Sequence, residues 1–418
     1  MEILNIVGGY KLEGEVEVSG AKNAILPIMA ATLLTRHPCY LEGVPDLIDV
    51  KVMGEVIKTL GAEVKKEGDS LYIDPSLAEE KEVQPELTRR LRASNLVMGP
   101  LLSRWHRFRV AYPGGCAIGA RPLDLHLKGF AAMGATIRES QGFIEATAPR
   151  LHGADIHLDF PSVGATENLM MAAVLAEGVT VLRNVAREPE IVDLQNFLNK
   201  MGARIQGAGQ DVIRIEGVSE LRGARHRIIP DRIEAGTFLV AVAATRGKAF
   251  VKGAQPEHLA AVIAKLQEMG AYVGCKKDGI YLEVTNRLQA VDCKTLPYPG
   301  FPTDMQPQIM ALMTTAQGTG IIIESIFENR FHHAAELKRM GADIKIEGRI
   351  AVVTGVPALS GAPVEARDLR GAAALVIAGL MAQGLTSVEG VQHLDRGYER
   401  LEEKLQSLGA KLWREGTE

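Results

Sequence analysis

The fold of this chain can be inferred from one stretch, Glu257-His258-Leu259-Ala260-Ala261-Val262-Ile263-Ala264-Lys265-Leu266-Gln267-Glu268-Met269-Gly270-Ala271. Its apolar residues recur at helical spacing with charged residues between them, which predicts an amphipathic helix covering a core from outside. Gly270 follows the helix at the position where a positive φ is favoured. The same ending, Leu or Met followed by Gly-Ala, occurs six times, with the glycines 68 to 73 residues apart. These glycines are Gly61, Gly134, Gly202, Gly270, Gly341 and Gly409. A fixed period predicts one supersecondary unit used repeatedly.

A second kind of helix recurs with the same period and is apolar on nearly every side. Such helices are predicted to be buried. We expect these inner helices over residues 24–31, 93–102, 165–176, 233–244, 305–316 and 372–382. Each unit then has one inner helix, one outer helix and strands, such as the strand expected over residues 350–353. Regular alternation of strands and helices predicts the α/β class.

Six units divide most simply into three plus three. We expect one three-repeat α/β domain over residues 22–229, and a second formed by residues 1–21 and 230–418, which contains both termini. The strand expected over residues 15–18 has no complete unit of its own there, so we expect it to complete the last unit. The inner helices would point their N-termini into a cleft between the domains, which is a usual location for ligands.

Composition excludes several classes of function. The 418 residues carry 47 basic and 51 acidic side chains, and no basic run typical of nucleic-acid binding occurs. No apolar run reaches the ~18 residues that a membrane span needs, and the N-terminus lacks a signal-peptide pattern. The four cysteines form no CxxC pair, and the ten histidines are scattered. We therefore expect a cytoplasmic protein with free thiols and no metal site.

The loop Pro113-Gly114-Gly115-Cys116-Ala117-Ile118-Gly119-Ala120-Arg121-Pro122 is the strongest candidate for chemistry. Three glycines and two prolines in ten residues predict a loop of defined shape rather than a helix or paired strand. Arg121 follows Cys116 by five residues, and a nearby cation favours the reactive thiolate. The alternative is that Cys116 is a small apolar residue, since free cysteines are usually buried and inert.

Polar residues stand at the heads of the inner helices. Three of them are of types that cap helices: Ser162, Asp231 and Asp304. Three others are poor caps, because a cation opposes the helix dipole there: Lys22, Arg92 and Arg370. The conflict disappears if an anion binds at these helix ends, so we expect phosphate or carboxylate sites.

These residues resemble the enolpyruvyl transferases, and within that family the enzymes whose acceptor is UDP-N-acetylglucosamine. The motifs that carry the resemblance span the chain: Ser19-Gly20-Ala21-Lys22-Asn23-Ala24, Arg92-Ala93-Ser94, the loop extended to Gly114-Gly115-Cys116-Ala117-Ile118-Gly119-Ala120-Arg121-Pro122-Leu123-Asp124-Leu125-His126, Ala186-Arg187-Glu188-Pro189-Glu190-Ile191-Val192-Asp193, Pro230-Asp231-Arg232-Ile233-Glu234, Phe301-Pro302-Thr303-Asp304-Met305-Gln306, Phe327-Glu328-Asn329-Arg330-Phe331, Asp368-Leu369-Arg370 and Asp395-Arg396-Gly397-Tyr398-Glu399-Arg400. The resemblance implies the EPSP synthase-like fold, with two inside-out α/β domains of three repeats around buried central helices.

The family implies addition–elimination chemistry. The enolpyruvyl group of phosphoenolpyruvate would be transferred to the 3′-hydroxyl of UDP-N-acetylglucosamine with release of phosphate, without cofactor or metal. That reaction begins peptidoglycan synthesis, so it serves cell wall biogenesis, cell shape, the cell cycle and cell division, and is the target of fosfomycin. Three alternatives stay open: transfer to shikimate 3-phosphate, a non-catalytic nucleotide-sugar-binding paralogue, and a scaffold without ligand. The oligomeric state also stays open, with a monomer slightly favoured.

The resemblance also implies roles for single residues. Cys116 would be the general acid or a covalent nucleophile, Asp304 the base for the sugar hydroxyl, and Asp368 an aid to the later proton removal. The alternative for both aspartates is helix capping. Five cations would bind phosphoenolpyruvate: Lys22 and Arg121 near the phosphate, and Arg330, Arg370 and Arg396 nearer the carboxylate. Lys22 and Arg396 also count as catalytic. The nucleotide sugar would contact Asn23, Arg92, Arg121, Pro122, Leu123, Asp124, Leu125, Ser162, Val163, Gly164, Asp304 and Ile326.

The sequence departs from the family pattern at three places. Trp105-His106-Arg107 replaces a glycine-containing turn, Tyr112 replaces an aliphatic residue and Gly371 replaces an alanine. None of these departures removes a cation or an acid.

Overall fold

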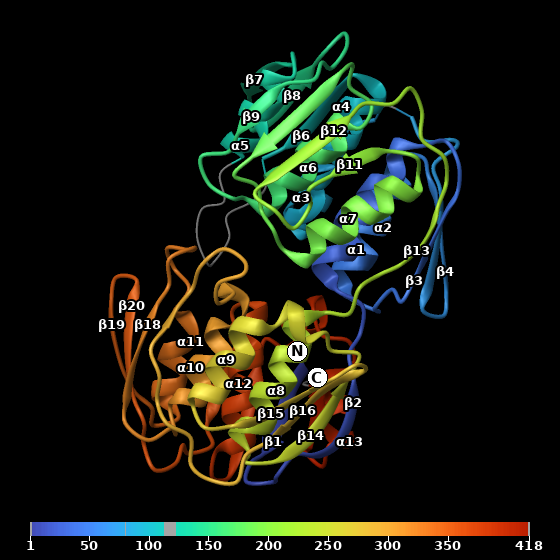
Figure 1. Cartoon of the computed structure of the whole chain (residues 1–418). Helices are drawn as coiled ribbons and strands as arrows, with labels where there is room; N and C mark the ends of the chain where they lie inside the picture. The colour runs from blue at the N-terminus through green and yellow to red at the C-terminus, as the bar shows by residue number, and fades with distance from the viewer. Residues whose placement is uncertain (1, 80, 113–122, 417–418) are drawn as a thin grey trace. The chain divides into compact units, whose positions relative to one another are not determined.

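The computed structural model describes residues 2–79, 81–112 and 123–416. Their internal contacts group them into two compact units. The described residues of 1–19 and 230–418 form one, here called the terminal unit, and those of 20–229 form the other, here called the central unit. Both chain ends therefore lie in the terminal unit (Figure 1). We propose that these units are the two three-repeat domains expected over residues 22–229 and over 1–21 with 230–418.

Strands of the terminal unit form three four-stranded sheets within the described residues. The first has the order β21 (Pro363–Glu365), β22 (Leu385–Glu389), β1 (Glu2–Val7), β23 (Lys411–Gly416). The second has the order β15 (Tyr272–Lys276), β16 (Gly279–Glu283), β14 (Lys248–Lys252), β2 (Glu13–Glu17). The third has the order β17 (Cys293–Lys294), β18 (Thr319–Ile323), β20 (Ile350–Thr354), β19 (Asp343–Glu347).

Strands of the central unit form three further sheets in the part of the chain that the structure describes. One has the order β11 (Arg204–Gln206), β12 (Val212–Glu216), β10 (Val179–Arg183), β9 (Asp155–His157). Another has the order β13 (Arg225–Arg227), β3 (Cys39–Glu42), β5 (Ser70–Asp74), β4 (Glu63–Glu67). The third is the three-stranded sheet β6 (Arg107–Ala111), β8 (Phe143–Thr147), β7 (Thr136–Ser140).

The four-stranded sheets share one pairing pattern, which confirms the predicted repeat. A short edge strand runs parallel to its neighbour, as β17 does to β18, and the remaining pairs are antiparallel, as β18–β20 and β20–β19 are. The same pattern holds in the sheets that begin at β9, β13, β21 and β2. Since one parallel pair and two antiparallel pairs recur in each, these units are copies of one supersecondary structure.

The inner helices are α1 (Lys22–Ala31), α4 (Met98–Trp105), α6 (Val163–Ala173), α8 (Arg232–Ala244), α10 (Gln306–Met313) and α12 (Leu369–Met381). The outer helices are α2 (Ile48–Thr59), α5 (Asp124–Ala132), α7 (Pro189–Lys200), α9 (Ala260–Glu268), α11 (His332–Arg339) and α13 (Leu401–Ser407). The remaining helices are α3 (Pro85–Arg90), η1 (Thr32–Leu34), η2 (Arg92–Val97), η3 (Pro256–His258), η4 (Thr303–Met305) and η5 (Val391–Arg396).

Figure 1 shows α8, α10 and α12 inside the terminal unit with sheets around them. Small and apolar side chains on all sides allow this burial, as in α12, where residues 370–380 are buried. The glycines that end the outer helices all have positive φ, between 94° and 106°, as predicted.

Two details of the sequence interpretation are wrong. The strand expected over residues 15–18 is β2, and it pairs with β14 rather than with the last repeat. The strand that completes the last repeat is β1, which pairs with β22 and β23. In addition, the inner helix expected over residues 93–102 is divided into the 3-10 helix η2 and the α-helix α4. Pairing partners and helix type depend on packing, which a local pattern does not specify.

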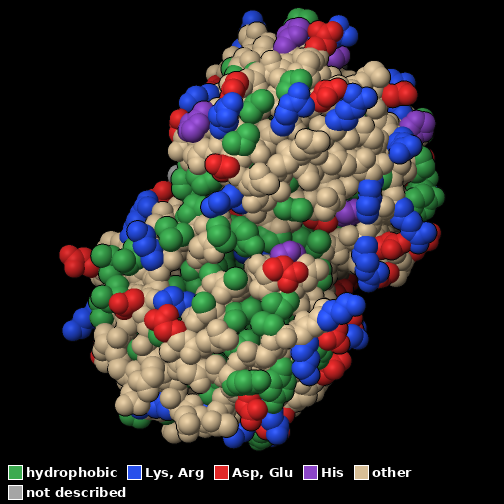
Figure 2. Space-filling view, in the orientation of Figure 1, with side chains coloured by type: hydrophobic (Ala, Val, Ile, Leu, Met, Phe, Trp, Pro, Cys, Tyr) green, Lys and Arg blue, Asp and Glu red, His purple; other side chains and the backbone are tan. Residues whose placement is uncertain are grey.

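Surface charges are mixed. On the face drawn in Figure 2, Lys and Arg side chains are interspersed with Asp and Glu, and neither sign forms a continuous area. Among the described residues, no helix is both long and apolar enough to span a membrane.

Candidate active site

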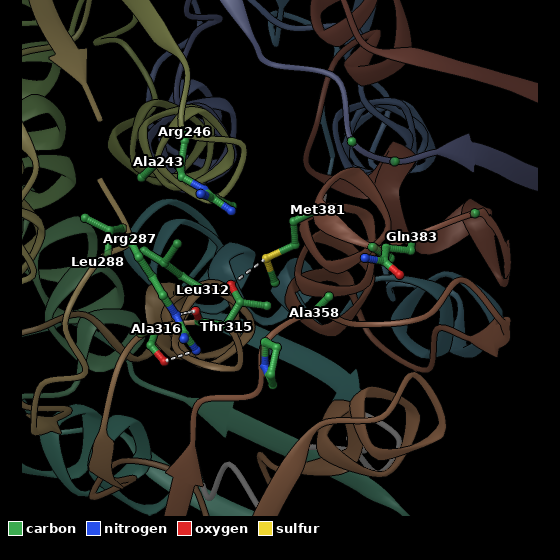
Figure 3. A pocket seen from close by; sticks show the side chains of 16 residues that line it. Ala243, Arg246, Arg287, Leu288, Leu312, Thr315, Ala316, Ala358, Met381 and Gln383 are labelled. Atoms are coloured by element: carbon green, nitrogen blue, oxygen red, sulfur yellow. Dashed lines mark hydrogen bonds between the residues drawn. The ribbon is translucent and has the colours of Figure 1, made fainter. Parts of the chain in front are cut away.

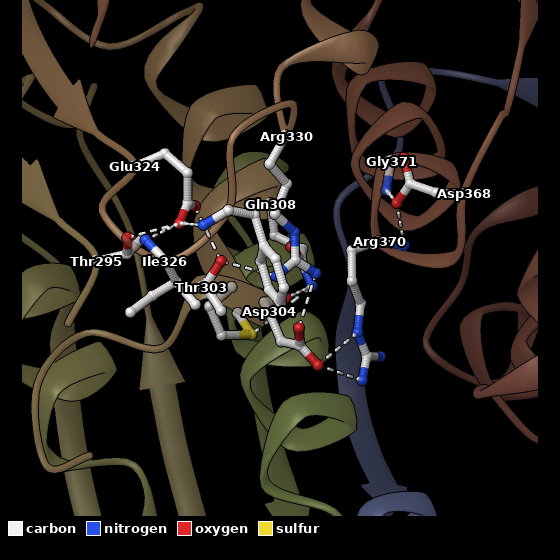
Figure 4. A network of polar contacts seen from close by, with 12 residues as sticks. Thr295, Thr303, Asp304, Gln308, Glu324, Ile326, Arg330, Asp368, Arg370 and Gly371 are labelled. Carbon is white, nitrogen blue, oxygen red and sulfur yellow. Dashed lines mark hydrogen bonds and ion pairs between the residues drawn. The ribbon is translucent and has the colours of Figure 1, made fainter. Parts of the chain in front are cut away.

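Asp304 lies between two arginines at the head of α10 (Figure 4). Arg330 Nη2 donates to Asp304 Oδ1 at 2.7 Å, and Arg370 donates to Asp304 Oδ2 through Nε at 3.2 Å and Nη2 at 3.0 Å. Both arginine side chains are 4% exposed, whereas the Asp304 side chain is 26% exposed. The carboxylate is therefore the accessible member of a buried, positively charged group.

Each of the two arginines has one side-chain nitrogen whose hydrogen-bond donor is unused within the described structure. Arg330 Nε and Arg370 Nη1 are buried and have no hydrogen-bond partner among the described residues. Burial disfavours the charged form of Arg370 and would lower its pKa. The interactions with Tyr398, Asp304 and Asp231 outweigh burial, so the pKa of Arg370 is raised. An unsatisfied guanidinium donor is costly when buried, and carboxylates and phosphates are the acceptors that suit it best. The arrangement is therefore able to bind an anion beside Asp304.

Asp368 caps α12. Its Oδ1 accepts hydrogen bonds from the backbone amides of Arg370 at 3.0 Å and Gly371 at 2.9 Å, so the capping alternative is observed for this aspartate. A Cβ on Gly371 would lie 2.8 Å from Asp368 Oδ2, so the glycine leaves room for the cap. His333 is buried close by, and its pKa is lowered to about 4. Burial is the main cause, the charge of Arg330 also lowers this pKa, and the charge of Asp368 opposes the shift. The imidazole is therefore neutral at pH 7.

Arg396 ends η5, which packs against α12. The Arg396 side chain is half-buried. Burial and the charge of Arg396 together lower the pKa of His393. The structure thus brings Asp304, Arg330 and Arg370 into contact in the terminal unit. Asp368 lies at the N-terminus of α12, and Arg396 ends the 3-10 helix that packs against α12.

Lys22 is the first residue of α1 in the central unit. Its Nζ lies 2.5 Å from Asp49 Oδ2, and the two side chains are 11% and 3% exposed. Sequence reasoning expected an anion near this cation but missed Asp49 as one of its partners. A usable signal existed, because Asp49 stands in the first turn of the amphipathic helix α2 between two apolar residues. Asn23 follows Lys22 in α1 and is half-buried.

The start of α6 lies against a buried histidine. Ser162 caps this helix by accepting from the Ala165 amide at 3.4 Å, which confirms its capping role, and Val163 and Gly164 follow. A Cβ on Gly164 would lie 3.4 Å from the His126 ring. The His126 Nδ1 lies 3.1 Å from Asn168 Nδ2, and burial lowers the pKa of His126 to about 4. The helix start thus presents backbone amides beside a neutral ring.

The other expected residues are placed as follows. Leu123 precedes α5, and Asp124 and Leu125 begin it. Arg92 is the first residue of η2. Ile326 is half-buried and follows β18. Cys116, Arg121 and Pro122 lie outside the described residues.

Two of the described cysteines, Cys39 and Cys293, lack the low pKa of a reactive thiol. Burial raises the pKa of Cys39 to about 11 and that of Cys293 to about 12. Both are therefore poor sources of thiolate. Cys275 is exposed on β15. Within the described ranges, no group of three or more His, Cys, Asp or Glu side chains could hold a metal ion.

Two of the departures from the family pattern are explained locally. His106 adopts φ +62° at the end of α4, so it occupies a left-handed position that favours glycine. Tyr112 is exposed, and its hydroxyl hydrogen-bonds Glu139.

A cavity of about 510 Å³ lies at the opposite ends of the terminal unit's inner helices (Figure 3). Its lining includes Arg246, Arg287 and the last residues of α8, α10 and α12. Arg287 donates to the carbonyls of Thr315, Ala316 and Val356. Cations at helix C-termini compensate the helix dipole. We therefore attribute the two arginines to stabilisation of helix ends, and we assign the candidate active site to the helix N-termini.

The family profile described as EPSP synthase (3-phosphoshikimate 1-carboxyvinyltransferase) matches residues 6–405. The chain therefore belongs to this family and has the fold of an enolpyruvyl transferase. The crystal structure of the enolpyruvyl transferase NikO from Streptomyces tendae superposes with a TM-score of 0.89 at 27% identity, covering 100% of this chain and 99% of that one. EPSP synthase from Acinetobacter baumannii superposes with a TM-score of 0.78 at 18% identity, with 100% of both chains covered. The expected fold is confirmed.

Within the family, sequence identity indicates which group of enzymes the chain resembles. UDP-N-acetylglucosamine 1-carboxyvinyltransferase 1 of Carboxydothermus hydrogenoformans is 58% identical over 414 residues, which cover 99% of this chain and 98% of the relative. The enzyme of the same name from Symbiobacterium thermophilum is 58% identical, with 98% and 94% covered. That from Caldanaerobacter subterraneus is 57% identical, with 96% and 97% covered. The resemblance inferred from the motifs is confirmed.

Proposed function

We propose that this protein transfers the enolpyruvyl group of phosphoenolpyruvate to the 3′-hydroxyl of UDP-N-acetylglucosamine and releases phosphate. The observation that carries the proposal is the 57–58% identity to carboxyvinyltransferases of that acceptor over nearly the whole chain. The shikimate branch is less favoured, since EPSP synthase from Acinetobacter baumannii shares 18% identity and the likeness there concerns the fold alone. The reaction opens peptidoglycan synthesis.

Asp304 is suited to the addition step. Its carboxylate takes the proton of the sugar hydroxyl, the hydroxyl oxygen bonds to C2 of phosphoenolpyruvate, and C3 receives a proton from a general acid. Cys116 is the acid that the family resemblance implies. In the elimination step C3 gives up a proton, the double bond re-forms and phosphate leaves. The 26% exposure of the Asp304 side chain between two buried arginines supports its role as the base that meets substrate.

The cations supply anion binding. Arg330 Nε and Arg370 Nη1 are buried donors without a partner in the described structure, and they suit the carboxylate of phosphoenolpyruvate. Lys22, held by Asp49, suits the phosphate together with Arg121, and Arg396 completes the cation set. The Ser162–Gly164 amides at the start of α6 suit the diphosphate of the nucleotide sugar. These assignments require no metal or cofactor.

We further infer that the protein acts in the cytoplasm. Cys39, Cys275 and Cys293 are free thiols, which fits a reducing compartment.

The test is phosphate release with both substrates by wild type, Asp304→Asn and Cys116→Ser. Asp304→Asn keeps the side-chain size but removes the base, so we expect kcat to fall by ~10²- to 10⁴-fold. Asp343→Asn changes an exposed aspartate on β19 and serves as the matched control with wild-type kcat. Turnover with shikimate 3-phosphate in place of the nucleotide sugar would reverse the assignment of the acceptor. Binding of the nucleotide sugar without phosphate release would favour the non-catalytic alternative.

A further inference from the structure

A buried glutamate that the sequence interpretation did not single out lies behind the Asp304 group. Glu324 directly follows β18 and is 1% exposed. Thr295 directly follows β17, and because these strands are parallel with Lys294 opposite Ile323, Thr295 and Glu324 are neighbours. Thr295 Oγ1 donates to Glu324 Oε1 at 2.9 Å. The register of one short strand pair therefore places a carboxylate beneath η4.

Thr303 connects this carboxylate to the candidate active site (Figure 4). Its hydroxyl donates to Glu324 Oε2 at 2.9 Å and accepts from Arg330 Nη1 at 2.7 Å. A hydroxyl has one proton, so donation to Glu324 turns a lone pair of Thr303 toward Arg330. Arg330 then has Nη1 on Thr303, Nη2 on Asp304 and Nε without a partner among the described residues. The hydroxyl therefore sets the rotation of the guanidinium plane.

Glu324 also holds the turn that follows it. Its Oε1 accepts from the backbone amides of Ile326 at 2.9 Å and Phe327 at 3.2 Å. The Phe327 ring lies 5.0 Å from the Arg330 guanidinium carbon, so the turn packs against the same arginine. One carboxylate thus restrains Arg330 from two sides.

We infer that Glu324 and Thr303 form a positioning relay for the reaction, in which Glu324 orients the Thr303 hydroxyl and the hydroxyl orients Arg330 against Asp304. This inference rests on the proposed function, since it assigns the relay to enolpyruvyl transfer. The Glu324 carboxylate accepts four hydrogen bonds in a buried place, and a fully satisfied buried network of this kind rigidifies what it contacts. Neither residue of the relay transfers a proton itself.

The test compares four variants of the full-length protein. Thr303→Val keeps the side-chain shape and removes the hydroxyl, so Arg330 loses one of its two anchors. We expect kcat to fall about tenfold and KM for UDP-N-acetylglucosamine to change less than about threefold, because Arg330 is assigned to phosphoenolpyruvate and not to the sugar nucleotide. Thr303→Ser restores the hydroxyl and should recover kcat to within about twofold of wild type. Thr319→Val, an exposed threonine on β18, is the control and should match wild type.

The pH dependence of kcat separates positioning from mere stability. A cation beside a carboxylate favours its charged form, so a loosened Arg330 lets the base bind a proton more readily. The acidic limb of the profile should move to higher pH in Thr303→Val and return in Thr303→Ser. Glu324→Gln keeps an acceptor for the Ile326 and Phe327 amides but presents an NH₂ to Thr303, which reverses that hydrogen bond. It should reproduce the loss of kcat with the melting temperature nearly unchanged.

The outcomes are distinct. A Thr303→Val protein with lowered melting temperature but wild-type kcat and pH profile would show a purely structural role and overturn the inference. Failure of Thr303→Ser to recover kcat would overturn it as well. A wild type without turnover on UDP-N-acetylglucosamine would instead contradict the proposed function itself.

Discussion

Residues of one type at the heads of the inner helices have different tasks. Asp231 caps α8 by accepting from the amides of Ile233 at 2.7 Å and Glu234 at 3.0 Å, and Asp368 caps α12 in the same way. Asp304 lies inside η4 and makes no cap; its carboxylate turns to Arg330 and Arg370. The capping alternative is thus observed for two of these aspartates and is wrong for Asp304. Distant arginines, rather than the local pattern, make the difference.

A prediction at this scale concerns the buried His126. Burial lowers its pKa to about 4 in the folded protein, whereas an unfolded histidine titrates near 6.5. Below pH 6.5 the unfolded chain binds a proton that the folded protein excludes, so the stabilising contribution is present above pH 6.5 and is lost as pH falls toward 4. The shift corresponds to about 3 kcal/mol over this window. Urea unfolding of wild type and His126→Asn between pH 4 and 8 measures it.

Asn keeps an acceptor for Asn168 Nδ2 without titrating, so His126→Asn should lose part of the acid sensitivity. The control is His37→Asn, which changes an exposed histidine in the same unit and should leave the pH slope unaltered. Equal slopes for wild type and His126→Asn would contradict the prediction.

At the scale of elements, glycines allow the inner helices to approach closely. The Gly99 amide in α4 donates to Asn168 Oδ1 of α6 at 2.8 Å. A Cβ on Gly99 would lie 2.3 Å from the Asn168 backbone oxygen, and a backbone atom has no room to move aside. The contact between α4 and α6 therefore depends on the absence of a side chain at this position.

We predict that Gly99→Ala destabilises the protein by about 1–3 kcal/mol, because α4 and α6 must separate. Gly54→Ala is the matched control, since Gly54 is also a buried helical glycine of the central unit but a Cβ there would lie 3.7 Å from Val64. Alanine is the better helix former, so Gly54→Ala should stabilise by about 0.5–1 kcal/mol. Urea midpoints of the two variants should move in opposite directions; movement in the same direction would refute the packing argument.

At the scale of the whole molecule, the described residues of the terminal unit come from both ends of the chain. The terminal unit therefore combines residues 1–19 with residues 230–418. Two strands come from the first segment: β2 pairs with β14, and β1 lies between β22 and β23. Without that segment, one sheet loses an edge strand and another loses a central strand.

We predict that a fragment of residues 230–418 alone does not fold, because the apolar residues of β1 and β2 are missing from its core. A permuted chain in which residues 1–19 follow residue 418 through a short linker should fold, since Glu2 lies opposite Gly416 in the β1–β23 pair. Circular dichroism and cooperative thermal unfolding of both polypeptides test this. Cooperative unfolding of the fragment without residues 1–19 would show that the two strands are dispensable.

The sequence by itself determined the six-fold repeat, the buried inner helices, the family and the residue types of the candidate site. These follow from periodicity and short motifs, which local spacing expresses directly. Only the tertiary structure decided that β2 joins β14, that Asp49 pairs with Lys22, and that Glu324 reaches Arg330 through Thr303. Each of these contacts joins residues from different elements of the chain, so it depends on how the elements pack. The energy of a hydrogen bond or ion pair is set by the position and burial of its partner rather than by sequence spacing.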